Sequence, residues 1–128
     1  MASRGIPGLV GGEHIGITVP NLAEAVDFFV NVIGCDFAFD GGDFTGDPEF
    51  MTTSLGVHPQ ARLKYCFLRC KTGLNLEVFE YDSPDQRTEP PKNSDIGGHH
   101  ICFYVDDIHA AIAHLKAHGV RVMGEPDH

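Results

Sequence analysis

Positively charged residues are scarce in this sequence. It contains 9 Lys and Arg against 18 Asp and Glu, which gives a formal net charge of −9. A protein that binds nucleic acid or an anionic membrane surface needs clustered Lys and Arg, and no cluster or stripe of these residues occurs. We therefore expect neither nucleic acid nor a membrane among the partners of this protein.

Long apolar runs are lacking too. No stretch approaches the roughly 20 apolar residues that span a bilayer, and residues 1–12 have none of the apolar core of a secretory signal. The four cysteines show no close pairing of the metal-binding or redox kind. Cys66 and Cys70 would lie about 13 Å apart along a strand, too far to form a disulfide. We expect a cytoplasmic protein with reduced thiols.

The sequence instead contains an internal repeat. With 128 residues, 42% of them hydrophobic and 21% charged, the chain has the size and composition of one globular domain. Residues 14–34 and 100–119 share one plan, namely a strand, a capped helix and a glycine that ends the helix. When His14 is aligned with His100, three pairs are identical: Ile15/Ile101, Val19/Val105 and Ala25/Ala111. Such a repeat predicts two copies of one structural module.

Capping residues define the two predicted helices. Asn21 can accept hydrogen bonds from the first free N–H groups, with Glu24 completing a capping box, and Gly34 ends the helix. Asp107 and Gly119 do the same in the second copy. Residues 62–70 and 74–81 read as two strands joined by a tight turn, while residues 120–123 begin a further strand. The polar, proline-interrupted residues 83–97 are predicted to link the modules.

Alternation along the strands brings chemically useful side chains to one face. His14, His100 and Glu77 are all predicted to point away from the helices. Imidazole and carboxylate together suit a divalent transition metal such as Zn, Fe, Mn, Ni or Co. The alternative is structural: both histidines would be half-buried strand residues and Glu77 a solvated one. Four further side chains share this face: Phe79, Tyr81, Cys102 and Tyr104.

Three stretches resemble motifs of the vicinal oxygen chelate superfamily, which includes glyoxalases, bleomycin resistance proteins and dioxygenases. They are residues 14–22 (HIGITVPNL), 75–81 (NLEVFEY) and 97–108 (GGHHICFYVDDI). The resemblance implies an α+β fold in which two βαβββ modules curl into a mixed-sheet cup around a metal. Residues 1–128 would be one domain, with module one at about 13–82, a linker at 83–97 and a partial module two at 98–128.

Module two is expected to lack its last strands. The resemblance places metal ligands at His14, Glu77 and His100, while the fourth ligand would come from the last strand of module two, beyond His128. The exposed sheet edge that results invites pairing with another chain, so we expect a homodimer or a higher homo-oligomer.

The resemblance implies a metal-dependent lyase or isomerase of the glyoxalase type. It would act on a small substrate with vicinal oxygens through an enediolate-like intermediate, in a cup lined by Phe79, Tyr81, Cys102 and Tyr104. The catalytic base is unassigned, because the base of the methylmalonyl-CoA epimerase-like branch would fall near Gln60 or Ala61, and neither is a carboxylate. The alternatives are a metal-free sequestering protein of the bleomycin-resistance type and an extradiol-type dioxygenase.

Overall fold

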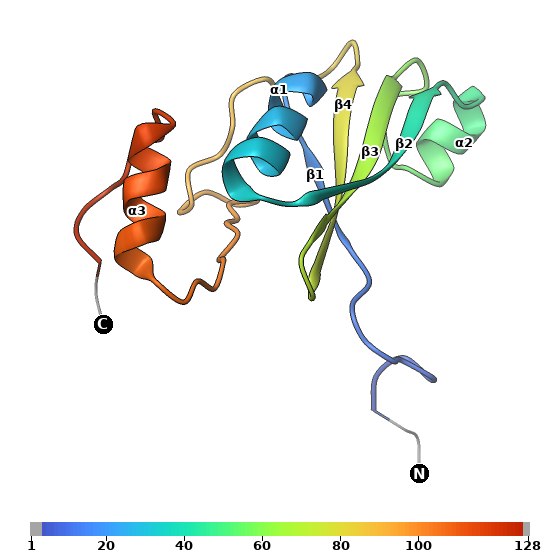
Figure 1. The fold of residues 1–128 in the computed structure, drawn as a ribbon. Helices are drawn as coiled ribbons and strands as arrows, with labels where there is room; N and C mark the ends of the chain where they lie inside the picture. The colour runs from blue at the N-terminus through green and yellow to red at the C-terminus, as the bar shows by residue number, and fades with distance from the viewer. Residues whose placement is uncertain (1–3, 127–128) are drawn as a thin grey trace. The chain divides into compact units, whose positions relative to one another are not determined.

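The chain divides into two compact units, Met1–Gln86 and Arg87–His128. A computed structural model describes residues 4–126, so residues 1–3 and 127–128, at the ends of the expected domain, lie outside the described part. Figure 1 shows the elements of each unit.

A four-stranded mixed sheet organises the first unit. In chain order its elements are β1 (Ile15–Thr18), α1 (Leu22–Asp27), η1 (Phe28–Ile33), β2 (Asp36–Phe44), α2 (Pro48–Thr53), β3 (Arg62–Cys70) and β4 (Leu74–Asp82). The strand order is β1-β4-β3-β2, with β1 parallel to β4 and the other pairs antiparallel (Figure 1). This βαβββ arrangement, with a short helix inserted before β3, confirms the predicted α+β fold.

The helix after β1 begins and ends where its capping residues predict. The Asn21 side chain accepts a hydrogen bond from the Glu24 backbone N–H at 2.9 Å, and Gly34 ends the helix with a φ of 100°. The last turn is a π-helix, η1, in which the Gly34 N–H bonds to the Phe29 carbonyl at 2.9 Å. A carboxylate from β4 adds a second cap, because Glu80 Oε1 accepts from the Leu22 N–H at 2.8 Å. Glu80 therefore joins the helix to the sheet.

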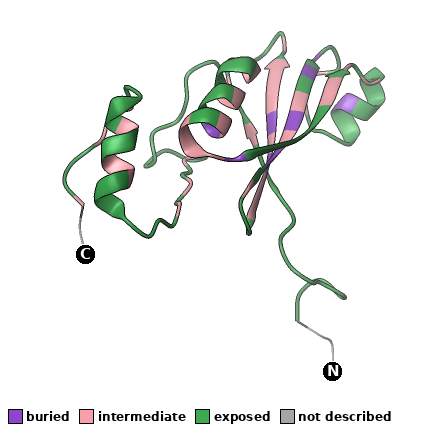
Figure 2. Ribbon diagram, in the orientation of Figure 1, coloured by how far each residue is buried: buried purple, intermediate pink, exposed green. Residues whose placement is uncertain are grey.

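Most of the core lies between the sheet and α1–η1. The buried strand residues on this face are cross-strand neighbours, Leu68 opposite Leu76 and Cys66 opposite Val78. The burial of Leu76 and Val78 leaves Glu77, which lies between them on β4, on the opposite face, as alternation predicts. Figure 2 shows these buried positions on β3 and β4. The other face of the sheet, called the open face below, carries His14, Gly16, Phe67, Glu77 and Phe79.

A second, smaller cluster closes one end of the open face. Met51 of α2 and Ala61 are fully buried, Leu63 is nearly so, and five partly buried side chains contact them: Phe44, Val57, Tyr65, Phe79 and Tyr81. Apolar burial of this kind stabilises the α2 segment against the strands. Phe79 and Tyr81 therefore each have one side in this cluster.

The second unit contains one helix, α3 (Ile108–Ala117). Asp107 caps it as predicted by accepting from the Ala110 N–H at 3.0 Å, and Gly119 follows with a φ of 74°. The strands predicted over residues 100–105 and 120–123 are not formed, which corrects the sequence prediction. A strand is stabilised by hydrogen bonds to a neighbour, and these segments pair with no other strand among residues 4–126. Within residues 87–126 no side chain is buried.

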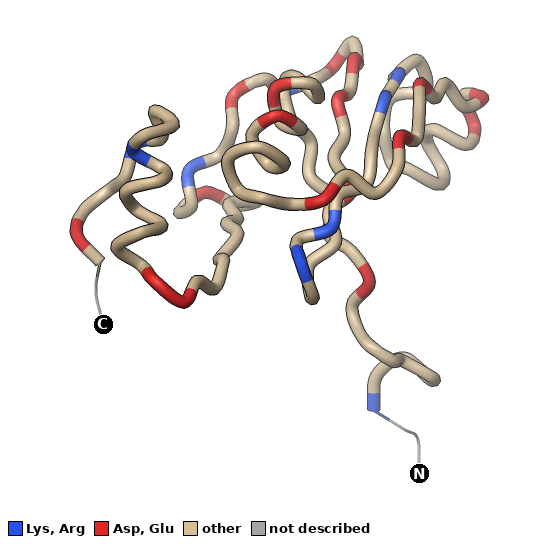
Figure 3. Tube along the Cα trace, in the orientation of Figure 1, with Lys and Arg blue, Asp and Glu red and all other residues tan. Residues whose placement is uncertain are grey.

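Basic residues are dispersed over the described part of the chain, as their spacing in the sequence predicts. Figure 3 shows Lys and Arg residues scattered among more numerous Asp and Glu residues. None of the helices within residues 4–126 has the length and apolar character needed to cross a membrane.

Candidate active site

His14 and Glu77 meet on the open face of the sheet. Gly16 pairs with Glu77 in the parallel β1–β4 ladder, and His14 is the preceding residue on the same face of the chain. The Nε2 atom of His14 lies 3.6 Å from Oε1 of Glu77. The two side chains are 37% and 20% exposed, so both remain accessible from solvent. Two of the three predicted metal ligands are thus brought together within the first unit.

The other ring nitrogen of His14 contacts a different carboxylate. Nδ1 of His14 is hydrogen-bonded to Oε2 of Glu13. This hydrogen bond is the main reason why the pKa of His14 is raised above 6.5; burial opposes it, and the charges of Glu13 and Glu77 reinforce it. A carboxylate on one ring nitrogen fixes the ring's orientation and leaves the opposite nitrogen directed at Glu77. Alternation along the chain does not predict a role for Glu13, because Glu13 is the immediate neighbour of His14 and has the opposite parity.

The spacing of these donors suits one metal ion. Two ligand atoms that each lie about 2.0–2.1 Å from a tetrahedral ion are about 3.4 Å apart. The distance of 3.6 Å between Nε2 of His14 and Oε1 of Glu77 is close to this value. A neutral imidazole and a carboxylate also form the donor set that first-row transition metals accept. The residues present therefore fit a metal of the class that the sequence predicts.

Gly16 gives the carboxylate and a neighbouring ring room to approach β1. A Cβ at this position would lie 3.2 Å from Cε2 of Phe79 and 4.0 Å from Oε1 of Glu77. The first distance is tighter than ordinary van der Waals contact. Gly16 therefore contributes to the site by lacking a side chain, which lets Phe79 and Glu77 pack closely against β1.

Aromatic rings form a continuous line beside the His14–Glu77 pair. Phe67, which is opposite Glu77 in the β3–β4 ladder, meets the His14 ring edge-on at 5.1 Å and 82°. Phe39 stacks on Phe67 at 4.7 Å and 20°. The line continues through Tyr65, Phe79 and Tyr81, with centroid distances of 6.2, 5.8 and 5.6 Å along the row. This surface can contact a flat or apolar part of a ligand.

Sequence reasoning found only part of this aromatic line. Phe79 and Tyr81 were predicted, whereas Phe39, Tyr65 and Phe67 were missed. The alternation of residues 62–70 could have revealed Tyr65 and Phe67, since both have the same parity as Leu63 and face away from buried Cys66. Tyr81 is also affected by the site: its pKa is raised by burial and, secondarily, by the negative charge of Glu77.

The other predicted site residues belong to the second unit. His100, Cys102 and Tyr104 all lie in the irregular segment before α3 and are exposed, Tyr104 by 98%. Within residues 4–126, no group of three His, Cys, Asp or Glu side chains gathers closely enough to hold a metal ion. Two of the three predicted ligands, His14 and Glu77, thus lie together in one unit, and the third, His100, belongs to the other.

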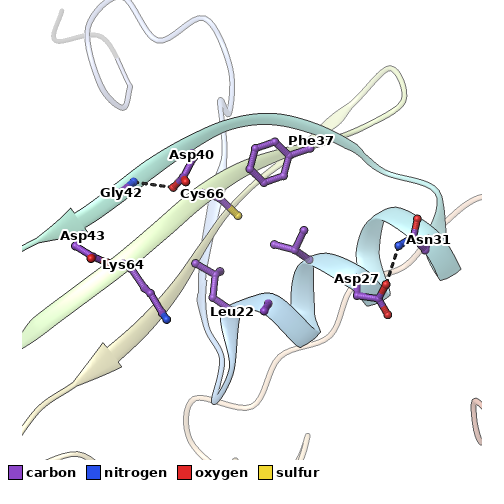
Figure 4. A pocket seen from close by; sticks show the side chains of 11 residues that line it. Leu22, Asp27, Asn31, Phe37, Asp40, Gly42, Asp43, Lys64 and Cys66 are labelled. Atoms are coloured by element: carbon purple, nitrogen blue, oxygen red, sulfur yellow. Dashed lines mark hydrogen bonds between the residues drawn. The ribbon is translucent and has the colours of Figure 1, made fainter.

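The first unit has one hollow beside His14 and a larger one on the other side of the sheet. A small one of about 220 Å³ lies beside His14, between the start of β1 and the β3–β4 turn. A larger groove of about 580 Å³ lies on the helix side of the sheet, between α1 and strands β2 and β3 (Figure 4). Its labelled polar residues include Asp40, Asp43 and Lys64. The larger groove contains neither His14 nor Glu77, so we place the candidate site on the open face.

The position of the base in the epimerase-like branch is occupied by residues that cannot serve. Ala61 is fully buried and carries no titratable group. The backbone N–H of Gln60 donates to Nδ1 of His58 at 3.0 Å, and a Gln side chain cannot take up a proton as a base must. Neither residue is a catalytic base.

Comparison with known proteins establishes the family. Residues 13–128 match the family model described as Glyoxalase/Bleomycin resistance protein/Dioxygenase superfamily. The chain therefore belongs to this superfamily, as the motifs around His14, Glu77 and His100 indicated.

The curated relatives include epimerases. The chain is 46% identical to a 2-epi-5-epi-valiolone epimerase from an Actinomyces species over 129 residues, which cover 99% of this chain and 69% of that protein. It is 30% identical over 116 residues to the mitochondrial methylmalonyl-CoA epimerase of Dictyostelium discoideum, covering 87% of this chain and 58% of the relative. The chain is thus shorter than both relatives, spanning little more than half of the second.

Solved structures share the fold. A glyoxalase family protein from Bacillus cereus superimposes with a TM-score of 0.70 at 19% identity, covering 94% of this chain and 81% of that one. The fosfomycin resistance protein FosX from Listeria monocytogenes, in a complex with Mn(II) and a dihydroxypropylphosphonic acid, gives a TM-score of 0.55 at 21% identity, covering 93% and 77%. At these identities the likeness concerns the fold alone.

Proposed function

We propose that this protein is a metal-dependent isomerase of the epimerase kind, acting on a small substrate with vicinal oxygens. The observation that carries the proposal is the convergence of His14 and Glu77, at 3.6 Å, on the open face of the sheet. The names of the two curated epimerase relatives support isomerase over lyase chemistry.

The chain's own residues would bind the metal and orient the substrate. His14 and Glu77 would hold a divalent transition metal together with His100, while Glu13 keeps the His14 ring in its binding orientation. When bound, the metal would act as a Lewis acid on two neighbouring substrate oxygens, which favours loss of a proton from the adjoining carbon. The aromatic line from Phe39 to Tyr81 would contact the substrate and exclude water from that side.

Metal content tests the metal part of this proposal. We would measure metal per chain by elemental analysis in protein purified without chelators or a His-tag, beside a His14→Ala/His100→Ala double variant. A His99→Ala variant is the matched control, since His99 is the exposed neighbour of His100. We expect near-stoichiometric metal in the wild type and the control, and its loss in the double variant. Equal metal in all three proteins would contradict the proposed ligand set.

The reaction is tested separately. The substrates named by the relatives, 2-epi-5-epi-valiolone and methylmalonyl-CoA, are incubated with the protein in deuterated water and followed by NMR. An epimerase exchanges the proton at the carbon that it inverts, so we expect deuterium at that carbon in one of these substrates. Activity should disappear when a chelator removes the metal and return when the metal is added back.

The stacked rings favour one alternative function. Phe39 lies nearly parallel to Phe67 at 4.7 Å, a geometry that suits contact with a planar compound. The alternative is therefore a sequestering protein of the bleomycin-resistance type that binds a planar ligand without metal. Tight binding of such a compound by metal-free protein, together with no proton exchange in either named substrate, would favour this alternative.

A further inference from the structure

Cys35 and Cys70 face each other at the end of the β2–β3 ladder. We propose that this pair is a site of reversible oxidation, at which a peroxide converts the two thiols into an intrachain disulfide. Local sequence patterns do not indicate such a site, because the two cysteines lie far apart along the chain. The inference concerns a different part of the molecule from the candidate active site.

The strand register brings the two cysteines together. Asp36 pairs with Arg69 in the antiparallel ladder, so extending that register by one residue beyond β2 places Cys35 opposite Cys70. Cys70 is near enough to Cys35 to contribute to the raised pKa of the Cys35 thiol. Both cysteines are free in this structure. Cys66, by contrast, lies within β3 opposite Asp40 and has no cysteine as its cross-strand neighbour on β2.

The backbone geometry at this pair suits a disulfide. The Cys35 N–H donates to the Phe29 carbonyl at 2.8 Å, and the Cys70 carbonyl accepts from the Gly73 N–H at 3.4 Å. These two groups are thus engaged elsewhere, as expected of a non-hydrogen-bonded antiparallel pair. Such pairs have Cα atoms about 4.5 Å apart, which is within the range of roughly 4.4–6.8 Å that a disulfide requires. Little backbone movement is needed to form the bond.

The two thiols differ in their access to solvent. Cys35 is 2% exposed, whereas Cys70 is half-buried at the start of the β3–β4 turn. Burial raises the pKa of Cys35 to about 12, with its hydrogen bond to Cys70 as the next cause, while the positive charge of Lys71 acts in the opposite direction. Cys35 therefore keeps its proton at neutral pH, and Cys70 is the thiol that a dissolved oxidant reaches first.

The reaction then proceeds in two balanced steps. The Cys70 thiolate attacks one oxygen of hydrogen peroxide and breaks the O–O bond, which gives a sulfenic acid on Cys70 and releases hydroxide. The sulfur of Cys35 then displaces the hydroxyl group of the sulfenic acid, and that group leaves as water with the proton of Cys35. The two thiols together lose two electrons and two protons, and the peroxide is reduced to two water molecules. A thiol in turn reduces the disulfide, which makes the modification reversible.

The disulfide would restrain the end of β3, which is linked through hydrogen bonds to the residue before His14. Arg69, next to Cys70, donates through Nη1 to the Asn75 side chain at 3.0 Å, and Asn75 donates to the Glu13 carbonyl at 2.9 Å. The bond would also join the end of η1 to the end of β3, so that the unfolded chain carries a closed loop. A loop closed in the unfolded state loses entropy there, so the oxidised protein should unfold at a higher temperature than the reduced one.

Mass spectrometry of peroxide-treated protein tests the proposal. The whole chain is reduced, freed of reductant, exposed to graded hydrogen peroxide, and alkylated before digestion without reduction. Of the four cysteines, we expect two to become inaccessible to the alkylating reagent, with Cys35 and Cys70 recovered in one linked peptide that is lighter by two hydrogens. Treatment with dithiothreitol should restore all four thiols.

Cysteine variants make the result decisive. Cys102→Ser, at an exposed position, is the matched control and should still lose two thiols. Cys70→Ser should abolish the linked peptide. The wild-type peptide map is sufficient by itself should a variant fold poorly. Recovery of Cys35 in alkylated form beside over-oxidised Cys70, or disulfides found only between chains, would overturn the proposal.

Discussion

Nε2 of His14 lies 3.6 Å from Oε1 of Glu77, although the two residues stand at opposite ends of the βαβββ module. The parallel pairing of β1 with β4 places them side by side, because the first and last strands of the module are neighbours in the sheet. The imidazole comes from the segment that leads into β1 and the carboxylate from β4, so neither segment alone supplies both groups. The strand order is therefore what creates the candidate site.

Replacing Glu77 with Gln should weaken metal binding by at least about tenfold. Loss of a hydrogen bond to a metal ligand already costs roughly 10–100-fold in affinity, and removal of a ligand's charge should cost no less. Gln keeps the size of the side chain, so the β4 strand should stay folded. Competition with a coloured chelator for added Mn²⁺ or Zn²⁺ measures the change.

The control for this substitution is Glu89→Gln, at an exposed position of the second unit. It removes the same charge from the chain at a position outside the first unit. Equal affinities in the Glu77→Gln and Glu89→Gln proteins would show that Glu77 binds no metal.

Local sequence signals predicted the parts of the fold that depend on neighbouring residues. The Asn21 cap, the Gly34 helix end and the alternation around Glu77 were all confirmed, since each depends on residues within one turn or one strand. The prediction of a strand over residues 100–105 was wrong because it, too, used only local alternation. Alternation records which faces suit burial, but a strand also needs a partner, and no partner occurs within residues 4–126.

Contacts that depend on the register between strands could not be predicted from local sequence patterns. The stacking of Phe39 on Phe67 follows from irregularities in the β2–β3 register between Phe37 and Phe39 and again after Asp40. Such bulges change which face a side chain takes, so simple alternation fails there. The Cys35–Cys70 pair was missed because only the pairing of β2 with β3 brings the two residues together.

Replacing Glu80 with Ala should lower the free energy of unfolding by about 1–2 kcal/mol, the usual cost of a lost helix cap. The Leu22 N–H, which donates to Glu80 at 2.8 Å, would lose its acceptor. Urea unfolding followed by circular dichroism gives the value. The control is Lys64→Ala, which removes only the 3.3 Å ion pair with Glu80 and should cost below about 1 kcal/mol because such surface pairs are weak. A larger loss in Lys64→Ala than in Glu80→Ala would contradict this account of the cap.

The same carboxylate predicts a pH dependence of stability. The pKa of Glu80 is lowered from 4.5, first by the Leu22 hydrogen bond and further by Lys64. A lowered pKa in the folded state contributes stability above the unfolded value, which is lost as the pH falls from about 4.5 through the folded value. The stability difference between wild type and Glu80→Ala should therefore shrink below pH 4.5. A difference that is constant across this range would show that the charge of Glu80 is irrelevant to the cap.

Replacing Phe67 with Leu should disturb His14 without unfolding the sheet. The two rings meet edge-on at 5.1 Å, so loss of the Phe67 ring current should move the His14 ring-proton resonances. The lost aromatic contacts should also cost about 0.5–1.5 kcal/mol of stability. Phe37→Leu is the matched control, because Phe37 lines the groove on the helix side of the sheet. NMR resonances of His14 that move equally in both variants would argue against a specific contact.

Replacing Gly16 with Ala should act on the candidate site through packing alone. The added Cβ would lie 3.2 Å from Cε2 of Phe79, so the ring must shift away from β1. Such overpacking typically costs about 1–3 kcal/mol, and the displaced ring should alter the neighbouring Glu77 side chain. We expect lower stability in urea and weaker metal affinity in the same variant. Gly11→Ala is the control, because a Cβ at Gly11 meets no atom within 4 Å, and both properties should stay at the wild-type value. A Gly16→Ala protein with unchanged stability and affinity would mean that Phe79 yields freely and does not constrain Glu77.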